Sequence, residues 1–226
     1  NKENAYIGEQ ITLTLKLYKK EDLKVTSIDD FKMPDFRGFW VEELHNPQRL
    51  KYQKQLEIID GIKYQVANLG QRALFPMPAK KHIIPSINIK IGIEIQKKRN
   101  RRDPFFDPFF SSYFSDSKVK ILRSKEIKID IKTFPDNKPK NFTGAVGAFD
   151  IVSSVDVETI KVNEGVTFTI SLEGTGNLNF FTFPEIIFPK NIEVFQPNEV
   201  FLKDVFRDQL TGKKSIEYIL IPRKSG

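Results

Sequence analysis

Apolar and polar residues alternate strictly in several segments of the chain, and this pattern narrows the possible folds sharply. Five isoleucines occupy every second position from Ile87 to Ile95, and similar runs cover residues 11–17, 127–131 and 166–172. Successive side chains of a β-strand point to opposite faces, so each run offers one apolar face to a core. No window of comparable length has the 3.6-residue period of a helix. We therefore predict an all-β fold built from antiparallel strands.

The length of the chain fits two domains better than one. It has 226 residues, whereas one immunoglobulin-type sandwich has about 100. Residues 135–140 are polar and proline-rich and follow a strand-like run, as a linker would. We expect tandem immunoglobulin-like antiparallel β-sandwich domains at residues 1–134 and 141–226. The first domain is expected to carry a long hairpin with an insertion at about residues 97–118.

The two halves share one order of motifs. Residues 9–15 match residues 164–170 in pattern, and Leu74-Phe75-Pro76 resembles Leu220-Ile221-Pro222. One supersecondary plan used twice explains this order. The second half reaches Gly226 before it repeats the long hairpin of the first half. We therefore expect the second sandwich to be truncated, without its closing strands.

The residue types needed for most catalytic and metal sites are scarce. The sequence has no cysteine, which excludes disulfides, thiolate nucleophiles and cysteine-based zinc sites. His45 and His82 stand without a second ligand or base pattern nearby, so both are expected at the surface or in turns. No nucleophile elbow, zinc-binding helix motif or P-loop occurs. We predict no enzymatic activity, no cofactor and no metal.

Two further motifs are expected to be structural. Gly174-Thr175-Gly176-Asn177 follows a strand, but Asn179 stands where a dinucleotide-binding fingerprint needs its third glycine. We interpret this segment as a turn between strands. The acidic pair Glu42-Glu43 lies in a polar stretch and is expected to be solvated.

Charge is concentrated in one place. The net charge is +7, and five positive residues lie within residues 97–102. The rest of the chain is nearly balanced, which indicates a local basic patch and no nucleic-acid-binding domain. The sequence contains no stretch of about 20 apolar residues, the length that a membrane-spanning helix needs.

The insertion holds an unusual aromatic segment. Asp-Pro-Phe-Phe occurs twice in tandem at residues 103–110, and six aromatic side chains fall within residues 105–114. A hairpin needs only two to five loop residues, so roughly twenty is excessive. The candidate partner-binding residues are Arg101, Arg102, Phe105, Phe106, Phe109, Phe110, Tyr113 and Phe114.

Three interpretations of this segment remain open. The aromatic side chains could fold back on their own domain or form a disordered tip. They could instead dock on a partner protein or touch a membrane surface, with the arginines steering the approach. A cation site at Asp103, Asp107 and Asp116 is the weakest of the three interpretations, because the Pro and Phe residues between them match no known cation-binding loop.

The order of several motifs resembles the BatD family, the Bacteroides-aerotolerance or oxygen-tolerance proteins. The likeness begins with Gly8-Glu9-Gln10 and Pro34-Asp35-Phe36-Arg37-Gly38-Phe39. It continues through the Asp-Pro-Phe-Phe repeat and Gly144-Ala145-Val146-Gly147, and ends with Gly174-Thr175-Gly176-Asn177 before Pro184 and Pro189.

The resemblance implies a bacterial envelope protein with a leader peptide, extracytoplasmic β-rich domains and a C-terminal transmembrane anchor outside this chain. It implies a location on the periplasmic side of the inner membrane. It also implies action with membrane proteins that contain von Willebrand factor A domains and with a MoxR-type ATPase in oxygen and stress tolerance. It implies no catalytic residues. We therefore expect a non-catalytic protein-interaction module, the alternative being a sandwich-fold hydrolase or a carbohydrate-binding module of the envelope.

Overall fold

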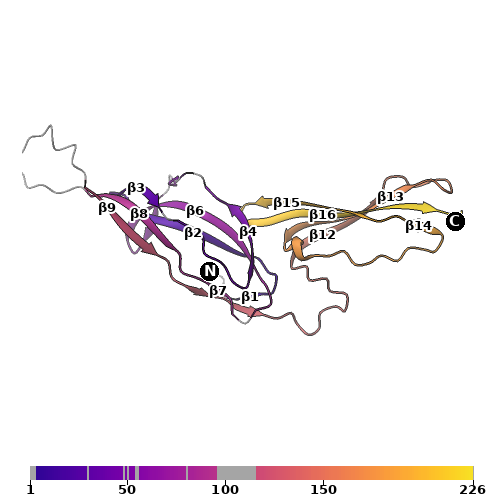
Figure 1. Cartoon of the computed structure of the whole chain (residues 1–226), viewed down its shortest axis with the longest axis horizontal. Helices are drawn as coiled ribbons and strands as arrows, with labels where there is room; N and C mark the ends of the chain where they lie inside the picture. Colours follow the sequence, from indigo (N-terminus) through magenta and orange to yellow (C-terminus); the bar gives the residue numbers. More distant parts are fainter. Residues whose placement is uncertain are drawn as a thin grey trace, which may run out of the picture.

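The computed structural model describes residues 4–29, 31–47, 49, 51–53, 56–79, 81–95 and 116–225. The predicted all-β class is confirmed, because the described residues form β-strands and a single short 3-10 turn. Figure 1 shows an elongated molecule in which two groups of strands lie end to end. We call residues 4–132 the first unit and residues 147–225 the second unit, because all pairing between the described strands stays within one or the other.

One layer of the first unit is an antiparallel sheet centred on its longest strand, β6. This strand pairs with β2 on one side and with β4 on the other, and β5 forms a hairpin with its start. The Asp60-Gly61 turn of that hairpin has positive φ at both residues, as the sequence predicts for this dipeptide. The bounds are β2 Ile11–Lys20, β4 Phe39–His45, β5 Glu57–Ile59 and β6 Ile62–Pro76.

The facing layer comes from three small sheets. Strands β3, β8 and β9 form an antiparallel sheet, β7 pairs with β10, and β1 pairs in parallel with β11. The bounds are β1 Asn4–Tyr6, β3 Lys24–Asp29, β7 Ile83–Ile84, β8 Asn88–Ile95, β9 Asp116–Arg123, β10 Ile127–Lys128 and β11 Asp130–Lys132. The β8–β9 pair is the predicted long hairpin. Its second strand is described from Asp116 on, which lies within the expected insertion at about residues 97–118.

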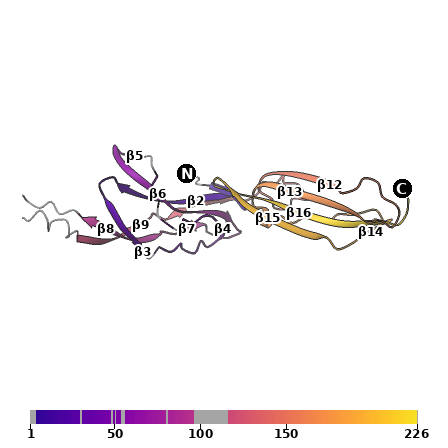
Figure 2. The ribbon, with the colours of Figure 1, turned by 90° about the horizontal axis from the view of Figure 1, so that it is seen from above.

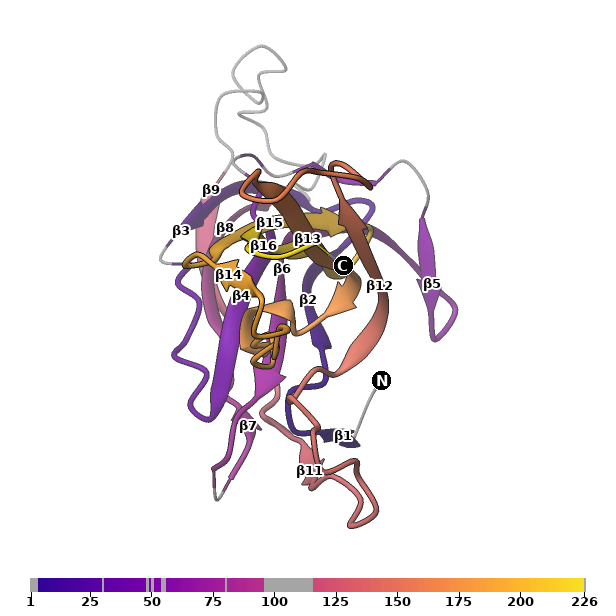
Figure 3. The ribbon, with the colours of Figure 1, turned by 90° about the vertical axis from the view of Figure 1, so that its right-hand side faces the viewer.

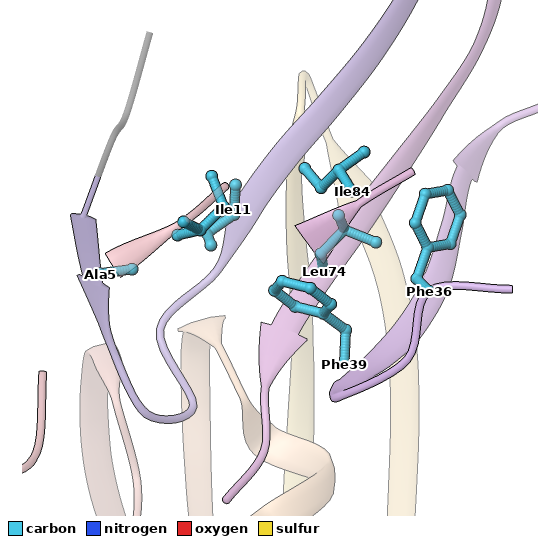
Figure 4. Packing of buried hydrophobic residues seen from close by; sticks show 7 residues of the cluster. Ala5, Ile11, Phe36, Phe39, Leu74 and Ile84 are labelled. Carbon is cyan, nitrogen blue, oxygen red and sulfur yellow. The ribbon is translucent and has the colours of Figure 1, made fainter. Parts of the chain in front are cut away.

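Two apolar clusters fill the space between the layers. One gathers Ile11, Phe39 and Leu74 from the first layer with Ile84 and Ile129 from the other, and Figure 4 shows its side chains pointing toward one another from several strands. The second lies under β8 and includes Leu17, Leu69, Ile89 and Ile91. Ile89 and Ile91 of β8 are thus buried as predicted, and Ile93 is partly buried. Ile127 is exposed, because the run 127–131 divides between β10 and β11.

The second unit is one antiparallel sheet in the order β12, β13, β16, with β14 and β15 both pairing with β16. Figure 2 shows these strands side by side. One face carries the cluster around Leu172, Ile216, Tyr218 and Leu220, and Phe181, Phe183 and Phe188 from the segment after β13 pack on it. The bounds are β12 Gly147–Val155, β13 Val166–Gly176, η1 Leu178–Phe180, β14 Ile192–Val194, β15 Asn198–Phe206 and β16 Gln209–Pro222.

The strand registers reveal the repeated plan. In the first unit Leu74 of β6 lies between Ile11 of β2 and Val41 of β4. In the second unit Leu220 of β16 lies between Val166 of β13 and Val194 of β14. Each central leucine is buried. The described part of the second unit supplies no counterpart of the first unit's second layer, so completion by further strands stays a prediction.

Candidate interaction surface

An alternating apolar stripe lies on the outward face of β15. Leu202 is 63% exposed, Phe206 is 61% exposed and Val200 is also exposed. Asp204 shares this face, whereas Phe201, Lys203 and Val205 face the opposite way, because side chains alternate along a strand. Phe201 packs with the core of the second unit, and Val205 packs at the contact with the first unit. The inward residues thus hold the strand in place while the outward residues remain free to contact another molecule.

A shallow groove runs beside this stripe. Its volume is about 400 Å³, and Leu202 and Asp204 line one side while Glu173, Thr211 and Lys213 line the other. The register places Leu202 next to Lys213 and Lys213 next to Glu173 across three strands. An apolar stripe beside paired charges of both signs is a common composition for the core and rim of a protein-binding surface.

An arginine adds a second anchor at the end of the stripe. Arg207 occupies the turn between β15 and β16 with φ of 59°, and its guanidinium carbon lies 5.2 Å from the centre of the Phe206 ring. This distance is within the range of a cation–π contact. Aromatic residues and arginine dominate the residues that contribute most to binding at protein interfaces.

The first unit holds this turn rigidly. The backbone carbonyl of Asp208 accepts hydrogen bonds from Gln10 Nε2 at 2.9 Å and from Thr12 Oγ1 at 2.8 Å. The Leu210 amide donates to Gln10 Oε1 at 2.9 Å. Below these bonds Leu210 is buried with Ala73 and Phe75 of β6. The stripe is therefore mounted on a base that both units build.

A half-buried carboxylate completes the contact between the units. Glu42 accepts hydrogen bonds from Trp40 Nε1 at 3.1 Å, Asn179 Nδ2 at 2.7 Å and Lys203 Nζ at 2.7 Å. Burial alone would raise the pKa of Glu42, but the bonds from Lys203, Trp40 and Asn179 together hold it below its ordinary value. The expectation that Glu42 is solvated was wrong, because Asn179 and Lys203 of the other unit cover it. Phe180 extends the contact with an edge-to-face stack on Trp40 at 5.8 Å.

Three of the motifs that carry the family resemblance meet at the same contact. Asn177 is 2% exposed, and its amide accepts from Val146 N at 2.7 Å and donates to the Gly144 carbonyl at 3.0 Å. A side chain at Gly8 would meet Asn177 Nδ2 at 2.6 Å. The prediction of a turn between strands at 174–177 was wrong in detail. Strand β13 runs to Gly176, and Asn177 precedes the 3-10 turn.

The predicted aromatic and arginine residues at 101–114 lie outside the described residues. The structure does describe the two strands that lead to them, and β8 and β9 pair from Asn88–Arg123 to Ile95–Asp116. The paired ends of β8 and β9 lie at the end of the molecule remote from the second unit (Figure 1). The sequence analysis did not predict the β15 stripe, although Val200, Leu202 and Phe206 all fall on even-numbered positions of one strand.

The first unit contains two further cavities. One has a volume of about 560 Å³, and none of its described lining residues carries a charge. The other, about 580 Å³, lies beside His82. This histidine is 8% exposed, with Nε2 2.8 Å from the Met77 carbonyl and its ring edge-on to Phe39 at 5.2 Å. The expected surface or turn position for His82 was therefore wrong. Its ring is buried because it contacts the Met77 carbonyl and the Phe39 ring.

The described residues form neither a metal site nor a membrane-spanning helix. Within the described part of the chain no group of three or more His, Asp or Glu side chains is arranged to hold a metal ion. None of the described segments is a helix long and apolar enough to cross a membrane. Comparison of the sequence with models of protein families and with curated proteins finds no match.

Proposed function

We propose that this chain is a non-catalytic protein-interaction module of a cell-envelope protein similar to BatD. In this proposal it lies on the periplasmic side of the inner membrane, anchored by a transmembrane helix outside this chain. Its partners are envelope membrane proteins with von Willebrand factor A domains, which act with a MoxR-type ATPase in oxygen and stress tolerance. The sequence resemblance supports the location and the partners, and the β15 stripe supports the mode of action.

The observation that carries the proposal is the rigid mounting of Val200, Leu202, Phe206 and Arg207. Three hydrogen bonds between the first unit's Gln10 and Thr12 and the backbone of Asp208 and Leu210 fix the turn that follows Phe206. Binding groups held in advance lose less conformational entropy when a partner docks. An exposed leucine and phenylalanine on such a base suit a pocket on another protein better than they suit water.

A pull-down with the 226-residue chain tests this proposal. The bait is incubated with detergent-solubilised membranes of the source bacterium, and the bound proteins are identified by mass spectrometry. We expect a protein with a von Willebrand factor A domain to be recovered, and the double variant Leu202→Ser, Phe206→Ser to lose it. At about 2 kcal/mol for each anchor, losing one corresponds to roughly a thirtyfold loss of affinity, and losing both corresponds to a larger loss.

A matched control separates loss of binding from loss of folding. Ile121→Ser removes an equally exposed apolar side chain from β9 of the first unit, and it should bind like the wild type. If the Leu202, Phe206 variant keeps both its thermal stability and its partner, the β15 stripe is not the binding surface.

The immunoglobulin-like character of both units is part of the proposal. The repeated three-strand plan supports a common origin for the two sheets, because matching registers recur around Leu74 and Leu220. The parallel β1–β11 pair supports a sandwich whose first and last strands meet at one edge. An experimental structure of the full-length protein with a different strand order in the second unit would exclude this topology.

The uncharged cavity of the first unit favours a second candidate, a carbohydrate-binding module. Asn46, Asn68 and Ser27 line it together with Phe31 and Tyr52. Tyr52 Oη is buried and has no hydrogen-bond partner among the described residues, and burial raises the pKa of this phenol. Neutral amides and hydroxyls beside aromatic rings are groups that can recognise a sugar.

Calorimetric titration with two neutral disaccharides, chitobiose and maltose, tests this candidate. Binding of either sugar that weakens in Tyr52→Phe would support it, because that change removes only the hydroxyl. Equal binding by the wild type and by Tyr52→Phe, or no heat at millimolar sugar, would count against it.

A further inference from the structure

Strand β12 is an open edge of the second unit's sheet. Its described neighbour is β13 alone, and the nine-residue pairing runs without a register shift. Eight of its nine residues are exposed, and only Phe149 is partly buried. Figure 3 shows β12 at the side of the second unit, next to β13. A row of backbone groups without a neighbouring strand is a template for pairing with another chain.

Every other edge strand in the described part of the molecule is protected against such pairing. Strands β2, β3 and β4 contain register shifts, and β1, β5, β7, β10, β11 and β14 have only two or three residues. Strands β9 and β15 are charged along their length, with Lys118, Lys120 and Arg123 on the first and Glu199, Lys203 and Asp204 on the second. Bulges, short strands and charges are the usual means of blocking edges. Strand β12 has none of these beyond the single charge of Asp150.

The exposed side chains of β12 are apolar on both faces of the sheet. Ile151 is 68% exposed and lies opposite Leu172 of the core cluster, so it extends the apolar face of the second unit. Val152 is 63% exposed on the other face, opposite Ser171. Val155, opposite Phe168, continues the core face. A strand added beside β12 would cover all three side chains.

We propose that a second copy of this chain pairs with β12, antiparallel and across a two-fold axis at Val152. This register brings Val152 opposite its own copy, Ile151 opposite Ser153, Asp150 opposite Ser154 and Phe149 opposite Val155. The two sheets become one continuous sheet, and both open edges disappear. The pairing is isologous and closed, so it stops at a dimer.

The position of Asp150 selects this register. A two-fold axis at Asp150 would place two carboxylates directly opposite each other, which is destabilising. An axis at Ile151 would set each carboxylate against Val152 and diagonal to the other carboxylate. With the axis at Val152 the two carboxylates are offset by four residues, about 13 Å along the strand, and each faces a serine hydroxyl. That separation exceeds the Debye length of about 8 Å at physiological salt.

Sedimentation analysis of the 226-residue chain tests the dimer. We expect the wild type to dimerise, and Val152→Lys to weaken dimerisation at least about tenfold, because two like charges would then meet at the axis. Leu202→Lys is the matched control, since Leu202 is equally exposed on the opposite edge of the same sheet. A wild type that stays monomeric at a few hundred micromolar overturns the proposal, whatever else binds β12. So does a well-folded Val152→Lys variant that dimerises like the wild type.

Cysteine cross-linking tests the register in a protein that has no cysteine of its own. Val152→Cys should form a disulfide-linked dimer rapidly on mild oxidation, because paired residues lie within disulfide range. Ser154→Cys should not link to its own copy but should link to Asp150→Cys in a mixture of the two variants. Rapid self-linking of Ser154→Cys, or none of Val152→Cys, overturns the register. The dimer does not use the β15 stripe. The Leu202, Phe206 variant therefore tests the proposed function, and Val152→Lys tests the dimer, and the two results are independent.

Discussion

A few residues with unusual surroundings hold the two units together. Asn177, which directly follows β13, uses both ends of its side-chain amide on the backbone of residues 144–146. Gly8 has φ of 73° and lies against that amide. Both residues were noticed in the sequence as parts of motifs, and the structure explains why those residue types are needed. Asn177 supplies a donor and an acceptor to the backbone of residues 144–146, and Gly8 leaves room for the Asn177 side chain.

Replacing Asn177 tests this role. Asn177→Ala leaves the Val146 amide and the Gly144 carbonyl without their partner, and each such buried group costs about 1–3 kcal/mol. We expect the free energy of unfolding to fall by roughly 2 kcal/mol or more in urea titrations. Asn198→Ala, which changes an exposed asparagine of β15, should lie within about 0.5 kcal/mol of the wild type. A similar, small loss in both variants would contradict the argument.

Two glycines with the same backbone conformation allow a second test. Gly8 has φ of 73° and Gly61 has φ of 76°, but a Cβ at Gly61 would meet nothing within 4 Å. Alanine at either position bears the left-handed backbone cost, about 1–2 kcal/mol. Alanine at Gly8 also collides with Asn177 Nδ2, so we expect it to lower the free energy of unfolding by about 1–3 kcal/mol more. Equal losses of unfolding free energy for Gly8→Ala and Gly61→Ala would show that the Asn177 side chain moves away from the new methyl group without cost.

At the level of strands, the junction is the contact between β4 and β6 of the first unit and the β15–β16 hairpin of the second. It combines polar and apolar contacts. Glu42 on β4 bonds Lys203 on β15, while Phe75 on β6 and Leu210 on β16 are buried together. Strand β6 therefore serves two cores at once. Its even-numbered residue Leu74 faces the interior of the first unit, and Ala73 and Phe75 face the second unit. The alternation of a strand makes this possible without any bend.

The charge of Glu42 makes the junction sensitive to pH. Because the folded pKa of Glu42 lies below its ordinary value, the ionised carboxylate stabilises the folded chain at pH values above the unfolded pKa, near 4.3. This contribution is lost as pH falls through the folded pKa. We expect Glu42→Gln to be less stable than the wild type at pH 7, with the difference shrinking below about pH 4.

Urea titrations between pH 7 and pH 3 measure this effect. Glu126→Gln, a change at an exposed carboxyl in the loop before β10, is the control for loss of a negative charge. A difference between the wild type and Glu42→Gln that stays constant over the whole pH range would show that the ionised form has no special role at the junction.

For the whole molecule, the junction decides whether the two units move as one body. Leu210 is 2% exposed and closes the apolar contact, so a charge there would be buried without a partner. We expect Leu210→Asp to separate the units while their strands persist. Small-angle X-ray scattering should then report a wider distribution of shapes than for the wild type, and circular dichroism should keep its β signal. Leu202→Asp, on the outward face of the neighbouring strand, should leave the scattering curve unchanged.

The sequence was sufficient for the strands themselves, because alternation with a period of two is a local property of the chain. It predicted the isoleucine-rich strand at 88–95, the hairpin that this strand forms, and the repeated plan around Leu74 and Leu220. Each of these depends on neighbours in sequence or on a pattern that recurs at a fixed spacing.

Only the tertiary structure decided which faces and edges are covered. Gln10, Glu42, Asn177 and Asp208 lie far apart in the sequence, and no local pattern joins them into one junction. His82 is buried by Phe39 and by the Met77 carbonyl, which a lone histidine in a sequence does not reveal. Ile151 alternates like a core residue and lies opposite Leu172, yet it is exposed because no described strand lies beyond β12. Burial depends on what lies across the sheet and beside it, and those neighbours come from distant parts of the chain or from another molecule.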